Sequence, residues 1–274
     1  MNIKASLFIL VLFLATPAYA DETHIFARAP QQSPAVTSKS WSPFIKELSK
    51  RIKRKIILKV YTTREDFESD IKKGNVDFYL GNPGYGVVGH LRHGYIPLIR
   101  SDKKRLEGIL VVKKDSKIQT LTDLDNKRIA FPGRTSFAAS LYLRASISDS
   151  SNINYQPLFT GTHDNTYRNV LIGKADAGGG VIRTFQQENV GFQKKLRIIY
   201  TTPGTQPHPI MSHPNVAVEI RQQIQQAILN MDKSEPGKKL LKNIKLQQPV
   251  IADYRRDYKS LEKATKQMYD YLLK

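Results

Sequence analysis

The sequence predicts an α/β protein with two lobes of similar plan, and two observations support this fold class. After residue 20, short β-branched apolar runs alternate with segments of helical periodicity, which is the pattern of a mainly parallel sheet flanked by helices. Two stretches, "DIKKGNVDFYLGNPGYG" and "VLIGKADAGGGVIRTF", also share one order of helix, glycine, aspartate, strand and glycine-rich turn. In both, the aspartate follows the glycine at the same distance, Gly74 to Asp77 and Gly173 to Asp176. A repeated order indicates a repeated structural unit.

The first twenty residues predict a signal peptide that is not part of the fold. They hold Lys4, an apolar run from Leu7 to Leu14 and the pattern Ala18-Tyr19-Ala20, which match the charged region, the apolar region and the cleavage site of such a peptide. A membrane anchor is the alternative, but a spanning helix needs ~20 apolar residues. We therefore expect cleavage after Ala20 and a mature chain in the periplasm.

Composition restricts the classes of function. The chain has no cysteine, so an exported protein of this size depends on its hydrophobic core and not on disulfides. Its formal net charge of +19 attracts anions. The basic residues are spread widely, without the basic and aromatic repeat that binds single-stranded nucleic acid. We expect an anionic small ligand and no nucleic-acid partner.

The first part of the chain predicts three strands and two helices. A strand at 23–30 leads through a polar loop to a helix that Ser40 or Ser42 caps, because the apolar residues from Trp41 to Ile52 share one face. The next elements are a strand, a helix and a strand, at 55–63, 64–74 and 76–81.

The second part repeats this alternation. A strand at 106–116 and a short helical turn at 122–127 come first. Strand, helix, strand, helix, and a strand with a glycine turn follow, at 128–131, 136–147, 152–162, 164–173 and 175–181. A strand and proline-rich crossover at 195–211 then lead to two amphipathic helices that cover a core, at 220–231 and 261–272.

Three loops at the carboxyl ends of predicted strands are candidates for a ligand site, since ligands of open α/β sheets bind there. They are "GNPGYG" at 81–86, "PGRTS" at 132–136 and "TGTHDN" at 160–165. A helix that begins in such a loop offers free N–H groups and a partial positive charge to an anion. Thr135 or Ser136, and likewise Thr162 or Asp164, are alternatively simple N-caps.

Five stretches, in order, resemble motifs of the phosphate/phosphite/phosphonate-binding proteins of bacterial ABC transporters. They are "GNVDFYLGNPGYG", "LTDLDNKRIAFPGRTSFAAS", "FTGTHDNTYRNVLIGKADAG", "PHPIMSHPNVAVEIRQQIQQAILNM" and "QPVIADYRRDY". The resemblance implies the two-lobed type II periplasmic-binding-protein fold. Each lobe of this fold is a mixed, mainly parallel sheet flanked by helices, and the ligand cleft lies between the lobes.

The resemblance also implies a division of the chain and a set of ligand contacts. Lobe one would comprise 21–107 and 206–274, and lobe two 108–205 with hinge strands at both ends. Thr135, Ser136 and His163 would hold the oxyanion, and Tyr85 would reach it from the other lobe. Tyr85 is alternatively a core residue, and His163 a structural one. The family implies no cofactor, no catalytic residue and no metal.

Two departures from the family pattern concern charge. Arg134 stands at the first position of the family's S-T-S motif, where it either contacts two oxyanion oxygens or turns to solvent. Val181 stands near a position where the family often has an acidic residue for a ligand amine. The resemblance therefore implies phosphate, phosphite or a small phosphonate without an amine. Arg183 adds positive charge nearby or is simply exposed.

Other functions are disfavoured by the residues. His163 and Asp164 are neighbours at a helix start, where they cannot form a base–orienter pair, so we do not expect an enzyme. His90 and His93 lie three apart as a metal pair or, more simply, as surface residues. The expected partner is an inner-membrane ABC-transporter permease, with a sensor kinase or other membrane partner as the alternative, and we expect a monomer. A basic protein that binds anionic surfaces is a further alternative, and it predicts strong salt dependence.

Overall fold

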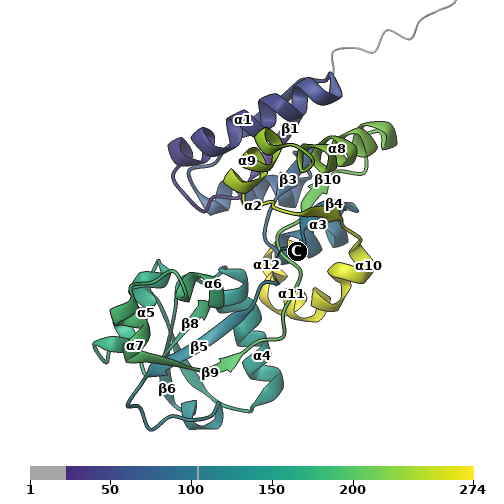
Figure 1. Cartoon of the computed structure of the whole chain (residues 1–274). Coiled ribbons are helices and arrows are strands. Elements are labelled where there is room, and N and C mark those ends of the chain that lie inside the picture. Colours follow the sequence, from purple (N-terminus) through teal and green to yellow (C-terminus); the bar gives the residue numbers. More distant parts are fainter. Residues whose placement is uncertain (1–22, 104) are drawn as a thin grey trace, which may run out of the picture.

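The computed structural model describes residues 23–103 and 105–274. The predicted signal peptide therefore lies outside the described residues. Within them, no helix is both long and apolar enough to cross a membrane. The described chain forms two sheets with flanking helices, as Figure 1 shows, and this confirms the predicted fold class.

Lobe one is built on a six-stranded sheet in the order β11-β4-β10-β3-β1-β2. Its strands are β1 (His24–Arg28), β2 (Ile56–Lys59), β3 (Phe78–Leu80), β4 (Ile96–Ser101), β10 (Ile210–Ser212) and β11 (Pro249–Ile251). Its helices are α1 (Pro34–Ile52), α2 (Arg64–Lys73), α3 (Pro83–His93), α8 (Val218–Met231), α9 (Glu235–Asn243), α10 (Tyr254–Asp257), η3 (Lys259–Leu261), α11 (Glu262–Met268) and α12 (Asp270–Leu273).

Lobe two is built on a five-stranded sheet in the order β7-β6-β8-β5-β9. Its strands are β5 (Gly108–Lys113), β6 (Lys127–Phe131), β7 (Tyr155–Phe159), β8 (Ala177–Val181) and β9 (Leu196–Thr201). Its helices are η1 (Thr122–Leu124), η2 (Phe137–Leu141), α4 (Tyr142–Ser150), α5 (His163–Leu171), α6 (Ile182–Phe185) and α7 (Val190–Lys195).

Two chain crossings join the lobes, from β4 to β5 and from β9 to β10. They pair with each other through an isolated bridge, in which Leu106 and Thr205 exchange both backbone hydrogen bonds at 2.9 and 3.0 Å. Strand β1 pairs in parallel with β2 and β3, and β6 pairs in parallel with β7 and β8. Strands that return through a crossing pair antiparallel, as β10 does with β3. Parallel pairing is therefore less dominant than the sequence predicts.

The first helix begins earlier than predicted. Ser33, and neither Ser40 nor Ser42, caps α1, because its Oγ accepts from the N–H of Val36 at 3.4 Å and Pro34 occupies the first helical position. The polar sequence "QQSPAVTSKS" therefore lies largely within the helix.

The glycines of β8 form a strand and not a turn. A Cβ at Gly179 would lie 2.4 Å from the carbonyl oxygen of Ala139, and a Cβ at Gly180 would lie 2.1 Å from Oη of Tyr167. The missing side chains let η2 and α5 lie directly on the sheet. The run of glycines therefore reflects close packing in the middle of lobe two.

One hydrophobic cluster crosses from one lobe to the other. It contains Tyr79 and Tyr85 of lobe one, Phe137 and Leu141 of lobe two, and Tyr269 of the C-terminal segment. Helix α11 contacts both α3 and α4, so the C-terminal segment lies against both lobes. This contact positions the loops discussed below.

Candidate functional site

The loops that follow β6 and β7 in lobe two begin side by side. Residues of β6 and β7 pair in parallel up to Phe131 and Phe159, and Thr160 N then donates to Phe131 O at 2.9 Å. Parallel strands end at the same edge of a sheet, so the loop at 132–136 and the start of α5 share that edge. The sequence predicted this pair of loops.

Thr135 and Ser136 offer unused hydroxyl groups at this edge. Ser136 occupies the N-cap position of η2, but its side chain makes no capping hydrogen bond. Within the described part of the chain neither hydroxyl has a hydrogen-bond partner, and both side chains are partly exposed. Helix α4 continues directly from η2, so the first N–H groups of a long helical run also point out of this loop. The simpler interpretation, that one of these hydroxyls caps the helix, is therefore not supported, because neither forms a capping hydrogen bond.

His163 is the first residue of α5 and does not cap it. That role belongs to Thr162, whose Oγ1 accepts from Asn165 N at 3.1 Å. Burial lowers the pKa of His163, so the ring is neutral at neutral pH. Its Nδ1 is buried and has no partner among the described residues. A buried, unpaired ring nitrogen is costly unless a ligand or water pairs with it.

Tyr85 is buried in lobe one. Only 1% of its surface is exposed, and its Oη donates to Glu68 Oε1 at 2.5 Å. Asn82 Oδ1 caps α3 by accepting from Tyr85 N at 3.0 Å, which places the ring behind the loop 81–86. Burial, and then the neighbouring Tyr269 and Glu68, raise the pKa of Tyr85 well above its usual value. The hydroxyl therefore stays protonated and already has an acceptor.

Arg64 is the lobe-one residue that sequence reasoning missed. Its Nη1 lies 3.5 Å from Tyr85 Oη, and its side chain lines a cavity of about 410 Å³. The rest of that lining comes from the carboxyl ends of β1 and β2 and the start of α1, namely Pro30, Gln31, Gln32, Ser33, Pro34 and Thr62. No acidic residue of the described chain lines this cavity. The sequence contains a signal for Arg64, since this residue begins the helix directly after the strand predicted at 55–63.

Tyr269 joins the two candidate loops and was also missed. Its Oη lies 3.3 Å from Asn82 Nδ2 in lobe one and 3.5 Å from the carbonyl oxygen of Thr135 in lobe two. Its ring packs against Tyr85, with 5.4 Å between ring centroids. No local sequence pattern predicts that Tyr269 contacts Asn82 and Thr135, because these residues are far apart in the chain.

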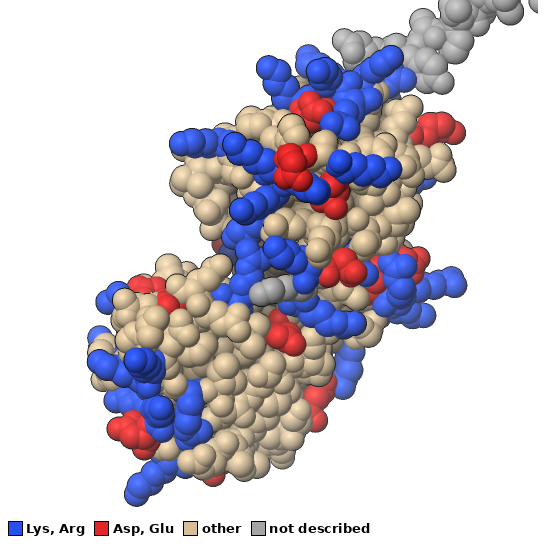
Figure 2. All heavy atoms as spheres, in the orientation of Figure 1, with Lys and Arg blue, Asp and Glu red and all other residues tan. Residues whose placement is uncertain are grey.

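The two arginines predicted for the site lie at its margins. The guanidinium of Arg134 lies over the ring of Phe159, 4.7 Å from its centroid, and the side chain is exposed. Arg183 lies in α6, just beyond the end of β8, and is also exposed. Val181 ends β8 and is partly exposed. Figure 2 shows that Lys and Arg side chains are spread over both lobes and also gather where the lobes meet.

The two histidines considered as a metal pair contact different backbone carbonyls. His90 Nδ1 lies 2.9 Å from Tyr95 O, and His93 Nε2 lies 2.9 Å from Lys72 O. The ring of His90 also stacks on Tyr254. Both histidines therefore serve packing around α3. Among the described residues no group of histidine and acidic side chains is arranged to hold a metal.

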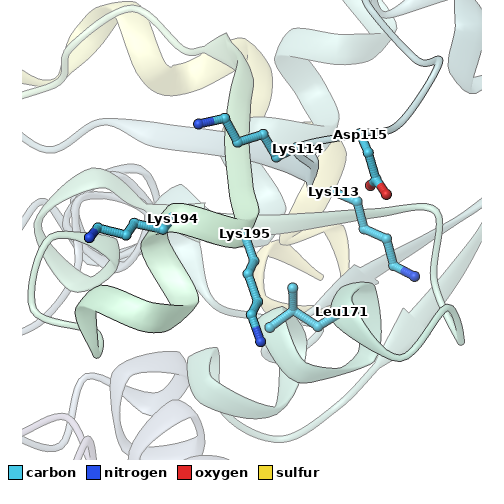
Figure 3. A pocket seen from close by; sticks show the side chains of 6 residues that line it. All are labelled: Lys113, Lys114, Asp115, Leu171, Lys194 and Lys195. Carbon is cyan, nitrogen blue, oxygen red and sulfur yellow. The ribbon is translucent and has the colours of Figure 1, made fainter.

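A second cavity, of about 460 Å³, is lined by residues of lobe two (Figure 3). Its lining consists of Lys113, Lys114, Asp115, Leu171, Lys194 and Lys195. Because β5 runs antiparallel to β8, the end of β5 at Lys113 lies at the opposite edge of the sheet from the loop 132–136. This lysine-lined cavity therefore belongs to the outer end of lobe two.

Comparison with known proteins gives one family and several structures of the same fold. A family model described as the periplasmic substrate-binding protein of a phosphonate ABC transporter matches residues 26–258. A Xanthomonas citri protein bound to chloride ion is 16% identical, with a TM-score of 0.81 over 92% of this chain and 100% of that one. PhnD1 of Prochlorococcus marinus, in complex with methylphosphonate, is 19% identical, with a TM-score of 0.74 over 91% of this chain and 99% of that one. The periplasmic aliphatic sulphonate binding protein SsuA of Escherichia coli is 15% identical, with a TM-score of 0.63 over 92% and 93%.

Proposed function

Because the chain belongs to the family of periplasmic substrate-binding proteins of phosphonate ABC transporters, we propose that its ligand is a small oxyanion without an amine. Members of this family bind a substrate for transport and are not enzymes. The ligands we propose are phosphate, phosphite or a small phosphonate such as methylphosphonate. The Prochlorococcus marinus protein of the same fold is known in complex with methylphosphonate.

The unpaired hydroxyls of Thr135 and Ser136 are the observation that carries this proposal. They lie with free helix N–H groups at the strand edge that also holds His163, whose Nδ1 lacks a partner among the described residues. Such donors suit a tetrahedral group with several acceptor oxygens, because hydrogen bonds to a charged acceptor are about twice as strong as neutral ones. Neutral His163 contributes one N–H donor.

We propose that lobe one, 21–107 with 206–274, closes over the ligand on lobe two, 108–205. Arg64 then brings a guanidinium to the anion from the cavity at the ends of β1 and β2. Tyr85 acts behind Arg64 by holding it through the Oη contact. Closure excludes water and strengthens the hydrogen bonds to the ligand.

The absence of an amine in the ligand follows from the groups around Val181. Its side chain offers no carboxylate, and the nearby Arg183 repels a cation. Glu68 is buried in lobe one and accepts from Tyr85, so its carboxylate is already engaged. An ammonium group would therefore lose its hydration without gaining a partner.

The partner we propose is the permease of the transporter, which receives the ligand from a monomeric binding protein. We further propose that the signal peptide is cleaved after Ala20 on export. A sensor kinase as partner has no observation in its favour.

Thermal unfolding of the mature chain tests the ligand. The protein is stripped of bound anions by partial denaturation and dialysis. It is then heated with phosphate, phosphite, methylphosphonate, 2-aminoethylphosphonate or sulfate at constant ionic strength. A ligand at a hundred times its dissociation constant stabilises the fold by ~2.7 kcal/mol. We expect the largest shift from phosphate, phosphite or methylphosphonate.

A double variant identifies the site. Thr135→Ala with Ser136→Ala is expected to abolish that shift, because it removes both hydroxyls. Ser148→Ala with Ser150→Ala is the matched control, since both serines are exposed on α4 and lie away from the loop. A largest shift with 2-aminoethylphosphonate, or an unchanged shift in the first variant, would contradict the proposal.

A further inference from the structure

Four basic side chains lie close enough to influence one another's charge, and Gln31 joins two of them, Arg28 and His208, by hydrogen bonds. Arg28 ends β1 and His208 lies in the crossing from β9 to β10. Lys245 follows α9, and Arg183 comes from α6 in lobe two. None of the four forms an ion pair within the described residues.

Arg28 is a buried cation with only neutral partners. Only 8% of Arg28 is exposed. Its Nη1 donates to Ala29 O and its Nη2 donates to Gln31 Oε1, both at 2.7 Å. The guanidinium also lies 5.4 Å from the ring centroid of Trp41. Burial without a counter-ion lowers the pKa of Arg28 to about 10, so the charge persists at neutral pH. A buried charge of this kind is costly unless an anion pairs with it.

Gln31 links Arg28 to His208 and fixes the proton on that histidine. Since Gln31 Oε1 accepts from Arg28, the other end of the amide is the NH₂ group, whose Nε2 lies 3.1 Å from His208 Nε2. An amide nitrogen only donates, so His208 Nε2 accepts and its Nδ1 carries the proton. The ring is therefore neutral and presents an N–H donor on its other side.

Lys245 and Arg183 lie within electrostatic reach of this pair. Burial first, and then Arg28, Lys245 and Arg183, lower the pKa of His208 to about 3. Burial, and then Arg183 and Arg28, also lower the pKa of Lys245. Among the described residues no carboxylate offsets these effects. The cluster thus collects positive charge from both lobes without an acidic group of its own.

The cluster lies beside the proposed phosphonate site. Arg28 Nη1 is 3.4 Å from the carbonyl oxygen of Leu80, which ends β3 just before the loop 81–86. Gln31 lines the same cavity as Arg64. Arg183 follows β8, and β8 is the direct neighbour of β6, whose end carries Thr135 and Ser136. Ala130 of β6 pairs in parallel with Gly178 of β8, so the loop 132–136 and Arg183 both follow the same edge of the lobe-two sheet.

We propose that Arg28, His208, Lys245 and Arg183 form a second anion subsite, and that the preferred ligand is a phosphonate with a second acidic group. The phosphonate half of this ligand rests on the function proposed above. The second group is a carboxylate, as in a phosphonocarboxylate, or a second phosphoryl group, since both offer the same acceptor oxygens to these donors.

Calorimetric titration of the stripped mature chain tests the subsite at fixed pH and ionic strength. The probes are methylphosphonate, phosphonoacetate, methylenediphosphonate and 2-oxopropylphosphonate, in which an uncharged methyl ketone replaces the carboxylate of phosphonoacetate. We expect phosphonoacetate or methylenediphosphonate to bind about tenfold or more tightly than 2-oxopropylphosphonate, which corresponds to ~1.4 kcal/mol. The tighter of the two identifies the second group.

Three single variants then assign the preference. Lys245→Gln is expected to remove most of the preference while methylphosphonate binds as before, and Arg183→Gln is expected to remove most of the preference as well. Lys242→Gln makes an equal charge change on α9 and is the control, so this variant should keep the preference for a second acidic group. Equal affinity for ligands with a charged and with an uncharged second group overturns the subsite and leaves phosphonate binding intact. A preference that survives both cluster variants overturns the assignment to these residues. Failure of every phosphonate to bind refutes the proposed function itself.

Discussion

Arg64 is the residue through which lobe one presents charge to the cavity at the ends of β1 and β2. Burial lowers its pKa, but its contacts with Tyr85, Tyr269 and Glu68 outweigh that effect and raise it. The guanidinium is therefore charged at every physiological pH. Its neighbours hold it at the cavity wall.

Replacing Arg64 should weaken anion binding more than it weakens the fold. Hydrogen bonds to charged groups contribute ~1.5–3 kcal/mol, so Arg64→Gln should raise the dissociation constant of methylphosphonate about tenfold to a hundredfold. Titration calorimetry measures this change. Arg51→Gln removes an equal charge from α1 and should change affinity little. Equal losses in the two variants would show that Arg64 acts only through overall charge.

The residues of the site differ in how far the sequence reveals them. The sequence predicts Thr135, Ser136 and His163 as ligand contacts because strand-loop-helix junctions have local signals, and that role stays a prediction. Arg64 was within reach of the same reasoning, since it begins the helix that follows the strand predicted at 55–63. Tyr269 was not, because it lies 187 positions from Asn82, and only the packing of the C-terminal segment brings them together.

Strand β8 is the element on which the geometry of lobe two depends. Its glycines let η2 pack so closely that the carbonyl of Ala139 would touch a side chain at Gly179. The position of η2 in turn sets the direction of the loop at Thr135 and Ser136. The three consecutive glycines predict a turn, because a local sequence pattern does not indicate how closely η2 and α5 pack on the strand.

A single methyl group in β8 should therefore destabilise lobe two. In Gly179→Ala the new Cβ would lie 2.4 Å from Ala139 O and 2.7 Å from Phe131 Cδ1, so backbone has to move. Overpacking of this kind costs about 1–3 kcal/mol. Chemical denaturation would measure that loss. Gly133→Ala is the control, because nothing lies within 4 Å of a Cβ there, and its free energy of unfolding should stay close to that of the parent. A neutral Gly179→Ala would refute this explanation of the glycines.

The elements with strong local patterns were predicted well, and the others were not. Helix α2 ends at Gly74 as expected, where φ is 71°. Helix α1 begins at least seven residues earlier than predicted, because Ser33 and Pro34 supply an N-cap and a first helical residue upstream of Ser40 and Ser42. The order of strands in each sheet was beyond the sequence, since antiparallel return strands depend on how the chain crosses between lobes.

Three histidines make the stability of the whole molecule depend on pH. Burial is the leading cause that lowers the pKa of His163, His208 and His213 in the folded protein. In the unfolded chain a histidine titrates near ~6.5. Between the two pKa values the unfolded chain binds more protons, so the free energy of unfolding rises with pH in that window.

We therefore expect the melting temperature to fall as the solution is acidified from about pH 7.5 to pH 5. The stabilisation is complete above the unfolded pKa, and it is lost as pH falls towards the folded value, about 3 for His208. His208→Gln should give a shallower dependence, because it removes one titrating group. The same slope in both proteins would exclude His208 as a contributor.

The stacking of Arg28 on Trp41 has an optical consequence. Trp41 is the only tryptophan of the chain, so all indole fluorescence comes from this one ring. A charge held 5.4 Å from the ring centroid shapes the emission of the indole, and an anion that pairs with the guanidinium alters that local field. Occupancy of the subsite can therefore be followed as a change in tryptophan emission without any added dye, so that the unlabelled protein is its own spectroscopic probe.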